Sequence, residues 1–147
     1  MKIRVTKEFT FDCAHALFNY NGLCKNIHGH TYKLFVTVIG NIIEDVENQS
    51  YGMIIDFSQL KSIVKNNIVD IFDHSLILSN RHRNPNNISD FQEVGKYIEF
   101  EGQATCENMV SYFAKVLIPI LPKEVELFSI KLYETPTSFA EWFASDN

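Results

Sequence analysis

The stretch CKNIHGH, residues 24–30, places one thiol and two imidazoles within a few positions of a chain that has five histidines and three cysteines. Residues two apart on a strand point to the same face, so His28 and His30 would present their imidazoles side by side. His15 lies at the end of an earlier alternating segment and reaches this pair if the two strands are neighbours. Three neutral imidazoles around an open fourth position form the ligand set of a catalytic zinc site, and imidazole also suits other transition metals.

The simpler alternative is a turn in which the HGH histidines only make hydrogen bonds. For HGH alone that alternative is favoured, because short motifs often occur by chance. The position of His15 at the end of the first expected strand favours a metal site instead. We therefore predict that His15, His28 and His30 bind one metal ion, with zinc as the best candidate.

Cys24 lies four residues before His28 and has two interpretations. It is either a fourth metal ligand in a closed structural site, or a base or nucleophile beside an open one, because a nearby cation favours the thiolate. A catalytic thiolate needs an orienting base and often a carboxylate. Asp73 and His74 could supply this relay, although read alone they are more typical of a polar helix end.

Glu134 shares its parity with the apolar residues of the last long alternating segment. Either the strand has ended and Glu134 lies in solvent, or its carboxylate is paired, since an unpaired acid on an apolar face is costly. A ligand that donates two hydrogen bonds, such as the 2-amino/N3 edge of a pterin or guanine, would match this carboxylate.

The composition of the chain is that of a globular protein, and its length suits a single domain over residues 1–147. The net charge of −5 argues against nucleic-acid binding, which requires a basic field. The start of the chain has no apolar segment typical of a signal peptide, and no apolar run approaches the ~20 residues of a membrane helix. With an odd count of cysteines, we expect reduced thiols and a cytoplasmic protein without a membrane partner.

Apolar and polar residues alternate over residues 3–13 and predict a strand, with a bulge or strand end near Lys7. Further strands are expected at residues 30–40, 51–55, 97–100, 125–134 and 138–143. Apolar residues at helical spacing predict helices over residues 56–72 and 105–118. This grouping indicates an α+β fold, an antiparallel sheet covered by helices on one face. If the other face is apolar, a partner subunit is its natural cover.

Six motifs occur in a fixed order: FDCAH at 11–15, CKNIHGH at 24–30, GMIIDFSQLK at 52–61, FDHSLIL at 72–78, TCEN at 105–108 and YETP at 133–136. Together they resemble the 6-pyruvoyl-tetrahydropterin synthase family. The resemblance implies the tunnelling fold, a four-stranded antiparallel sheet with two helices on one face. It also implies a homo-oligomer, a hexamer or another multiple, in which several sheets form a barrel and active sites lie at subunit contacts.

The resemblance also implies a cofactor and site residues. The motifs assign zinc binding to His15, His28 and His30, proton abstraction to Cys24, the relay to Asp73 and His74, pterin anchoring to Glu134, and lining of the pterin pocket to Thr105 and Glu107. The family's substrate is 7,8-dihydroneopterin triphosphate, whose anionic tail needs cations. Lys25, Lys33, Arg81 and Arg83 are candidates without a firm assignment.

Three residues separate Cys24 from His28, which resembles the bacterial queuosine-pathway branch, the 6-carboxy-tetrahydropterin synthases. Animal pyruvoyl synthases have a longer insertion there, and a folate-linked branch has glutamate instead of the cysteine. The stretch 81–103 is longer than in compact members and does not change the assignment. We expect a zinc-dependent lyase that forms 6-carboxy-5,6,7,8-tetrahydropterin, acetaldehyde and triphosphate. The alternatives are pyruvoyl synthase activity on the same substrate, and a non-enzymatic, zinc-stabilised module that binds pterins or purines.

Overall fold

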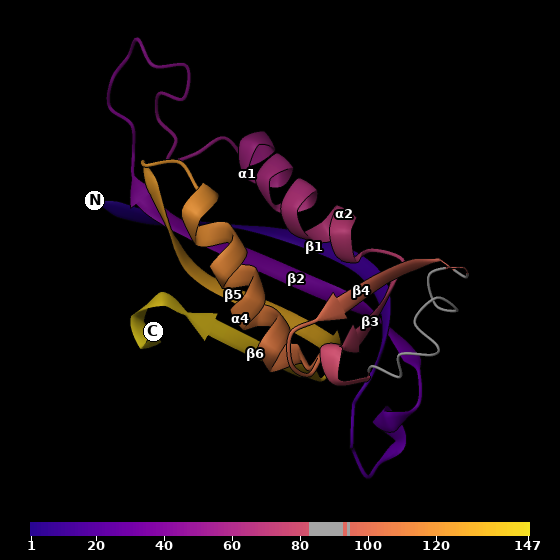
Figure 1. The fold of residues 1–147 in the computed structure, drawn as a ribbon. Helices are drawn as coiled ribbons and strands as arrows, with labels where there is room; N and C mark the ends of the chain where they lie inside the picture. The colour runs from indigo at the N-terminus through magenta and orange to yellow at the C-terminus, as the bar shows by residue number, and fades with distance from the viewer. Residues whose placement is uncertain (83–92, 94) are drawn as a thin grey trace.

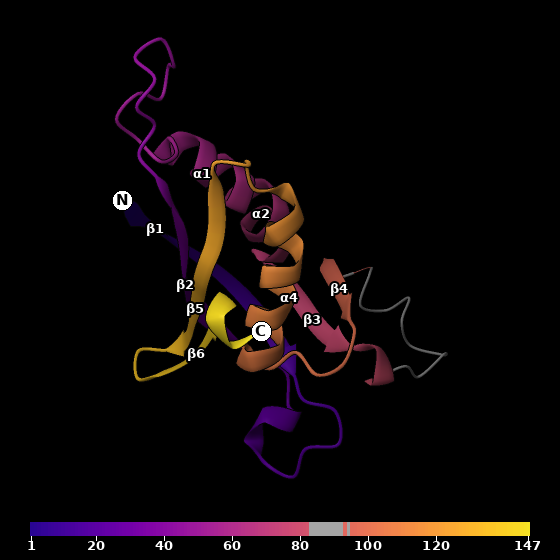
Figure 2. The same cartoon turned by 90° about the vertical axis from the view of Figure 1, so that its left-hand side faces the viewer.

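The computed structural model describes residues 1–82, 93 and 95–147, which form a sheet with helices on one face (Figures 1 and 2). The strands are β1 (Lys2–Ala16), β2 (His28–Asn41), β3 (Ser75–Ser79), β4 (Lys96–Phe100), β5 (Val125–Thr135) and β6 (Ser138–Phe143). The helices are α1 (Phe57–Val64), α2 (Asp70–Phe72) and α4 (Cys106–Leu117). In both views the helices lie on the same side of the sheet, so the apolar core lies between these two layers.

The sheet has the strand order β4-β3-β1-β2-β5-β6. The pairs β1–β2, β2–β5 and β5–β6 are antiparallel, whereas β1–β3 and β3–β4 are parallel. The expected four-stranded antiparallel sheet is therefore present as β1, β2, β5 and β6, and the two further strands, β3 and β4, extend it by parallel pairing at its β1 edge. The unpredicted strand β3 is a short, buried, nearly continuous apolar run, which is typical of parallel strands and has no alternation to reveal it.

The strand expected at residues 51–55 is a turn. Gly52 has a φ of +82°, and the amide of Met53 donates to the carbonyl of Ser50 at 3.0 Å. Ile54 and Ile55 are buried in the core without joining the sheet. Their burial explains why both residues are apolar. A short apolar run in a sequence can be either a strand or a buried non-strand segment, and the run alone does not distinguish the two.

The register between β1 and β2 is unbroken from Lys2, opposite Asn41, to His15, opposite His28. The bulge considered near Lys7 is absent from this pairing. Paired residues point to the same face of a sheet. The core-facing series of both strands therefore continues directly into three histidines, because Cys13 also lies opposite His30 in this register.

The helical segment after residue 56 begins as expected. The side chain of Asp56 accepts a hydrogen bond from the amide of Ser58 at 2.6 Å, which caps α1. The expected single helix is continuous but changes geometry, since a π-helical turn, Lys65–Val69, separates α1 from α2. Four of its apolar residues are fully or almost fully buried: Leu60, Val64, Ile68 and Phe72.

Helix α4 begins after Thr105, whose side-chain oxygen accepts a hydrogen bond from the amide of Asn108. Its expected apolar stripe is buried except for the half-buried Val116. The helix ends at Leu117, and the next turn, Ile118–Ile120, contains a proline that cannot extend the α-helical hydrogen bonding.

The face of the sheet opposite the helices, here called the outer face, is mostly polar along β1 and β2. Lys33 lies 3.5 Å from the carboxylate of Glu8, and the hydroxyls of Thr6 and Thr37 are 2.8 Å apart. Aromatic side chains occur on this face mainly toward β5 and β6. An apolar outer face, the condition under which a covering partner subunit was expected, is therefore found only in that part. Within the described residues, no helix is long and apolar enough to cross a membrane.

Gly40, near the end of β2, lies against another backbone. A Cβ atom at this position would be 2.6 Å from the carbonyl oxygen of Glu124. We expect Gly40→Ala to destabilise the protein by about 1–3 kcal/mol, because an added methyl in a closely packed region forces backbone movement. Urea denaturation measures this change, and Asn41→Ala, at an exposed neighbouring position, is the matched control. Equal stability of the two variants would contradict the close approach.

Candidate metal centre and active site

His15, His28 and His30 form one cluster at the end of the β1–β2 pair. Each offers one ring nitrogen, and these nitrogens all lie within 4.8 Å of one another. The Nε2 atoms of His15 and His28 are 3.1 Å apart. Ligand atoms at ~2.0 Å from a tetrahedral ion lie about 3.3 Å from one another. The distance between the Nε2 atoms of His15 and His28 is therefore close to that between two ligands of one ion. The strand register produces this closeness, because it places His15 opposite His28.

Backbone carbonyls determine the tautomers of two histidines. His15 Nδ1 donates to the carbonyl of Ala104 at 2.6 Å, and His28 Nδ1 donates to the carbonyl of Asn26 at 2.8 Å. With the proton on Nδ1, each Nε2 keeps its lone pair and points into the cluster. Such outer hydrogen bonds orient histidine ligands in metal sites.

The environment of His30 indicates whether these three residues fit a metal ion. His30 Nε2 is buried and has no hydrogen-bond partner among the described residues. Burial lowers the pKa of both His15 and His30 below the ordinary 6.5, although the carboxylate of Glu134 opposes this shift. Three imidazoles with ring nitrogens that converge within 4.8 Å of one another fit a divalent transition metal.

A cavity of about 260 Å³ adjoins the cluster and brings together most of the other predicted site residues. His15, Cys24, Thr105, Glu107 and Glu134 all line it. These residues come from four segments far apart in the sequence, which meet because β1 and β5 flank β2 and because α4 packs on β5. The cavity thus places a thiol and a carboxylate next to an imidazole of the candidate metal site.

Cys24 lies in a short 3-10 helix, Leu23–Lys25, outside the sheet. Its carbonyl accepts a hydrogen bond from the amide of Leu17 at 2.8 Å, which ties this turn to the end of β1. The close group of candidate ligand atoms contains only histidines within the described residues. This geometry favours a thiol beside the metal site over a fourth ligand in it.

Glu134, on β5, is one of the residues that line the cavity. Its Oε1 atom is 3.6 Å from His15 Nε2 and 3.9 Å from His30 Nε2. The hydroxyl of Tyr32 donates to the same oxygen at 3.3 Å. The carboxylate is therefore not isolated in solvent, which was one of the two interpretations of its place in the sequence.

Asp73 and His74 form a dyad in a different place. Asp73 Oδ2 accepts a hydrogen bond from His74 Nδ1 at 2.9 Å, and Asp73 Oδ1 accepts one from the amide of Asp12 at 2.9 Å. These bonds, first that from Asp12, hold the pKa of Asp73 below its ordinary value. With Nδ1 engaged by Asp73, Nε2 is the ring nitrogen of His74 that remains available to another group, on a side chain that is 79% exposed.

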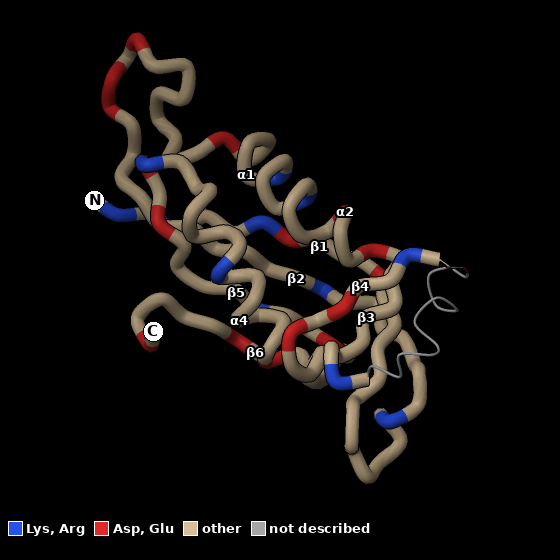
Figure 3. The backbone as a smooth tube through the Cα atoms, viewed as in Figure 1, with Lys and Arg blue, Asp and Glu red and all other residues tan. Residues whose placement is uncertain are grey.

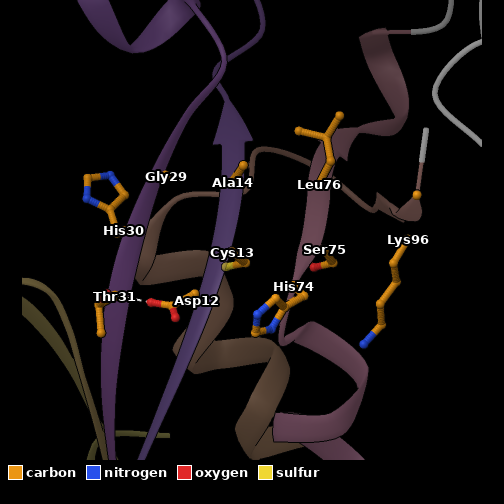
Figure 4. Close-up of a pocket in the computed structure, with 11 residues that line it drawn as sticks. Asp12, Cys13, Ala14, Gly29, His30, Thr31, His74, Ser75, Leu76 and Lys96 are labelled. Atoms are coloured by element: carbon orange, nitrogen blue, oxygen red, sulfur yellow. Dashed lines mark hydrogen bonds between the residues drawn. The ribbon is translucent and has the colours of Figure 1, made fainter.

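The dyad faces a second cavity of about 520 Å³, lined by Asp12, Thr31, His74 and Lys96 among others (Figure 4). Asp12 and Thr31 alternate with the core-facing residues, so this cavity opens on the outer face. The backbone amide of His74 donates a hydrogen bond to the carbonyl of Asp12, whereas the carbonyl of Cys24 accepts one from the amide of Leu17. Five residues of extended chain separate Asp12 from Leu17, which is about 16 Å. Within one chain the dyad is therefore separated from the Cys24 cavity by the sheet.

The family model described as 6-pyruvoyl tetrahydropterin synthase matches residues 4–144. The chain belongs to this family. It is therefore an enzyme of the 6-pyruvoyl tetrahydropterin synthase family, as the six motifs predicted.

Relatives and solved structures agree with this family. The 6-carboxy-5,6,7,8-tetrahydropterin synthase of Haemophilus influenzae is 36% identical over 141 residues, covering 95% of this chain and 97% of that protein. The protein of the same name in Rickettsia conorii is 31% identical over 150 residues, covering 95% and 99%. The 6-pyruvoyl tetrahydropterin synthase structure from Plasmodium falciparum is 26% identical, with a TM-score of 0.72 and 96% of each chain covered. The likeness to this structure confirms the expected tunnelling fold.

Members of the 6-pyruvoyl tetrahydropterin synthase family act on pterins, and a phosphorylated pterin would need cations. Figure 3 shows Lys and Arg spread over several elements rather than gathered in one place. Lys33 lines a cavity of about 700 Å³ together with Glu134, and Lys25 is exposed directly after the cavity-lining thiol. Arg81 lines a separate cavity beside α4, and Arg83 lies outside the described residues. The positions of Lys25 and Lys33 suit such a role better than that of Arg81.

Two residues that contact predicted site residues, Tyr32 and Lys96, were not predicted from the sequence. Tyr32 bonds to Glu134, and Lys96 donates to the carbonyl of Asp73 at 2.9 Å, next to the dyad. Tyr32 has the parity of His28 and His30, and this parity was the one available signal. Lys96 is brought in by β4, and no local pattern connects it to Asp73.

The stability of the metal-free protein should fall as the pH is lowered from 7.5 to 5. Burial lowers the folded-state pKa of His15 and His30, so the unfolded chain binds more protons below pH 6.5 and is favoured there. The stabilising contribution of Asp73, whose pKa is lowered from 3.8, is essentially constant over this window and is lost only at lower pH. Urea midpoints of chelator-treated protein measure the slope.

The matched control for this slope is His82→Gln, which changes a histidine outside the cluster. It should keep the pH dependence of the parent chain. A midpoint that is constant or rises toward pH 5 would contradict the buried, neutral state of the two imidazoles.

Proposed function

We propose that the protein is a zinc-dependent 6-carboxy-5,6,7,8-tetrahydropterin synthase of queuosine biosynthesis, acting on 7,8-dihydroneopterin triphosphate. The observation that carries the proposal is the cluster of three imidazoles, in which the Nε2 of His30 is buried without a hydrogen-bond partner among the described residues, next to a cavity that His15 lines together with Cys24 and Glu134. Curated relatives that carry this enzyme's name support the choice of reaction.

His15, His28 and His30 would hold the zinc ion, which when bound supplies a Lewis acid that stabilises negative charge on the hydroxyl oxygens of the substrate side chain. The Nδ1 bonds to the carbonyls of Ala104 and Asn26 keep two of these ligands oriented before any metal binds. Such preorganisation avoids a change of tautomer when the site fills.

Glu134 would bind the pterin ring by accepting hydrogen bonds from its 2-amino and N3 groups. A carboxylate suits this edge because it offers two acceptors in one plane. Thr105 and Glu107 would line the same pocket at the start of α4. The cavity of about 260 Å³ suits a bicyclic ring, and the side chain with its triphosphate would extend beyond it.

The sulfur of Cys24 would take a proton from the side-chain carbon next to the ring. Proton transfer by a positioned group typically contributes 10²–10⁴-fold to the rate. Internal redox transfer between the side chain and the ring then saturates the ring, and triphosphate leaves. Addition of one water molecule and cleavage of a carbon–carbon bond give the 6-carboxylate and release acetaldehyde. His74 Nε2, the ring nitrogen that is not bonded to Asp73, would accept the proton from the sulfur of Cys24 and later return it.

The relay from His74 to Cys24 would join two subunits. The dyad opens on the outer face, whereas Cys24 lines a cavity on the helix side of the same sheet. Each catalytic site would therefore combine the metal ligands and thiol of one copy with Asp73 and His74 of a neighbouring copy. This arrangement makes a homo-oligomer necessary for turnover.

Product analysis tests the proposal. The zinc-loaded protein is incubated with 7,8-dihydroneopterin triphosphate, and the products are identified by mass spectrometry. We expect 6-carboxy-5,6,7,8-tetrahydropterin and an equimolar amount of acetaldehyde. A 6-pyruvoyl product without acetaldehyde would assign the related synthase reaction instead, and an unchanged substrate would leave a binding module.

A further inference from the structure

We propose that Tyr32 is a positioning residue that holds the carboxylate of Glu134 in the orientation that binds the pterin. The inference rests on the proposed function, because it assigns a support to that function's ligand-binding carboxylate. Tyr32 lies on β2 two residues after His30, in the core-facing series that contains the candidate metal ligands.

The ring of Tyr32 is immobilised by the core. Its residue is fully buried, and the ring stacks on Phe11 with centroids 5.3 Å apart and an interplanar angle of 12°. The edges of two candidate metal ligands also contact it, with ring centroids 5.6 Å away for His30 and 6.3 Å away for His15. A hydroxyl on such a ring has a fixed position, unlike one on an exposed side chain.

Glu134 depends on this hydroxyl. Tyr32 donates to Glu134 Oε1 at 3.3 Å, and within the described residues no other donor to this carboxylate is found at hydrogen-bond distance. His15 Nε2 lies 3.6 Å away but has no proton to give, because the His15 proton is on Nδ1. The carboxylate is 28% exposed, so without Tyr32 it could rotate toward solvent.

In this arrangement the two oxygens of the Glu134 carboxylate make different hydrogen bonds. The Tyr32 bond occupies one lone pair of Oε1 and fixes the plane of the group. Oε2 and the second lone pair of Oε1 remain for the two donors of a pterin amino edge. Preorganisation of this kind improves affinity by removing the cost of ordering the group upon binding.

The test measures binding of pterin itself, 2-amino-4-oxopteridine, by isothermal titration calorimetry, which does not require turnover. Tyr32→Phe keeps the ring and its stack but removes the donor. We expect its Kd for pterin to rise about tenfold, which is about 1.4 kcal/mol and is typical of one lost hydrogen bond to a charged group. Zinc content and the far-UV circular dichroism should match the parent chain.

Two further variants make the test specific. Tyr112→Phe removes a hydroxyl from a half-exposed tyrosine on α4 and should leave the Kd unchanged. In a Glu134→Gln background, Tyr32→Phe should weaken binding by less than twofold, because its effect passes through the carboxylate.

The outcomes separate the inference from the function. If the parent chain binds pterin and Tyr32→Phe binds it equally well, the positioning role is overturned while the proposed function stands. Equal tenfold losses with and without Glu134 also overturn it, since Tyr32 then acts by another route. A parent chain that does not bind pterin overturns the proposed function and this inference together.

Discussion

Cys24→Ala is expected to abolish turnover while the protein keeps one zinc ion per chain. The sulfur lines the cavity beside His15 but does not belong to the close group of candidate ligand atoms. Removing it should therefore leave the metal site intact and eliminate the group that abstracts the proton. We expect kcat to fall by about 10³-fold or more, at the upper end of the usual contribution of a general base.

The measurement pairs a steady-state assay with metal analysis by mass spectrometry on the same preparation. Cys13→Ala is the matched control, because Cys13 is a buried thiol of the core whose pKa is raised by burial to about 12. This control should keep turnover within a few-fold of the parent. Loss of zinc from Cys24→Ala would instead show that the thiol is a fourth ligand, and the structural-module interpretation would replace ours.

His30→Ala is expected to lose both the metal and the activity. Its Nε2 is buried and has no hydrogen-bond partner among the described residues, so no structural role for that atom is evident among them. Loss of an outer hydrogen bond alone typically costs 10–100-fold in metal affinity, and we expect removal of a ligand to cost at least about 100-fold. Competition with a chromogenic zinc chelator measures the affinity.

The control for His30→Ala is His82→Gln, at a histidine whose ring contacts Phe18 outside the cluster. It should bind zinc like the parent chain. The stability of metal-free His30→Ala should be close to that of the metal-free parent, because the imidazole is not part of the apolar core. A variant that retains zinc with unchanged affinity would remove His30 from the ligand set.

The histidine cluster could be predicted from the sequence because its geometry follows from strand parity. His28 and His30 are two apart on β2, and the register of the β1–β2 pair places His15 directly opposite His28. Both relations depend on regular strands, and this pair has no register shift. The starts of the helices near Asp56 and Thr105 could also be predicted, because the hydrogen bonds that cap them are local.

The unpredicted features depend on contacts between distant segments. Strand β3 is buried by parallel pairing with β1 and β4, and its five residues carry no periodic signal. The dyad follows α2 directly, but the face on which it opens is set by the bond of His74 to Asp12. Tyr32 gains its role only because β5 brings Glu134 to its hydroxyl. No local pattern encodes such pairings.

Anomalous diffraction at the zinc absorption edge, from crystals of the metal-loaded protein, tests the central claim most directly. We expect one strong peak at about 2.0–2.1 Å from the Nε2 atoms of His15, His28 and His30. The sulfur of Cys24 should lie outside bonding distance of that peak. A peak bonded to the Cys24 sulfur, or one that His15 does not contact, would contradict the account.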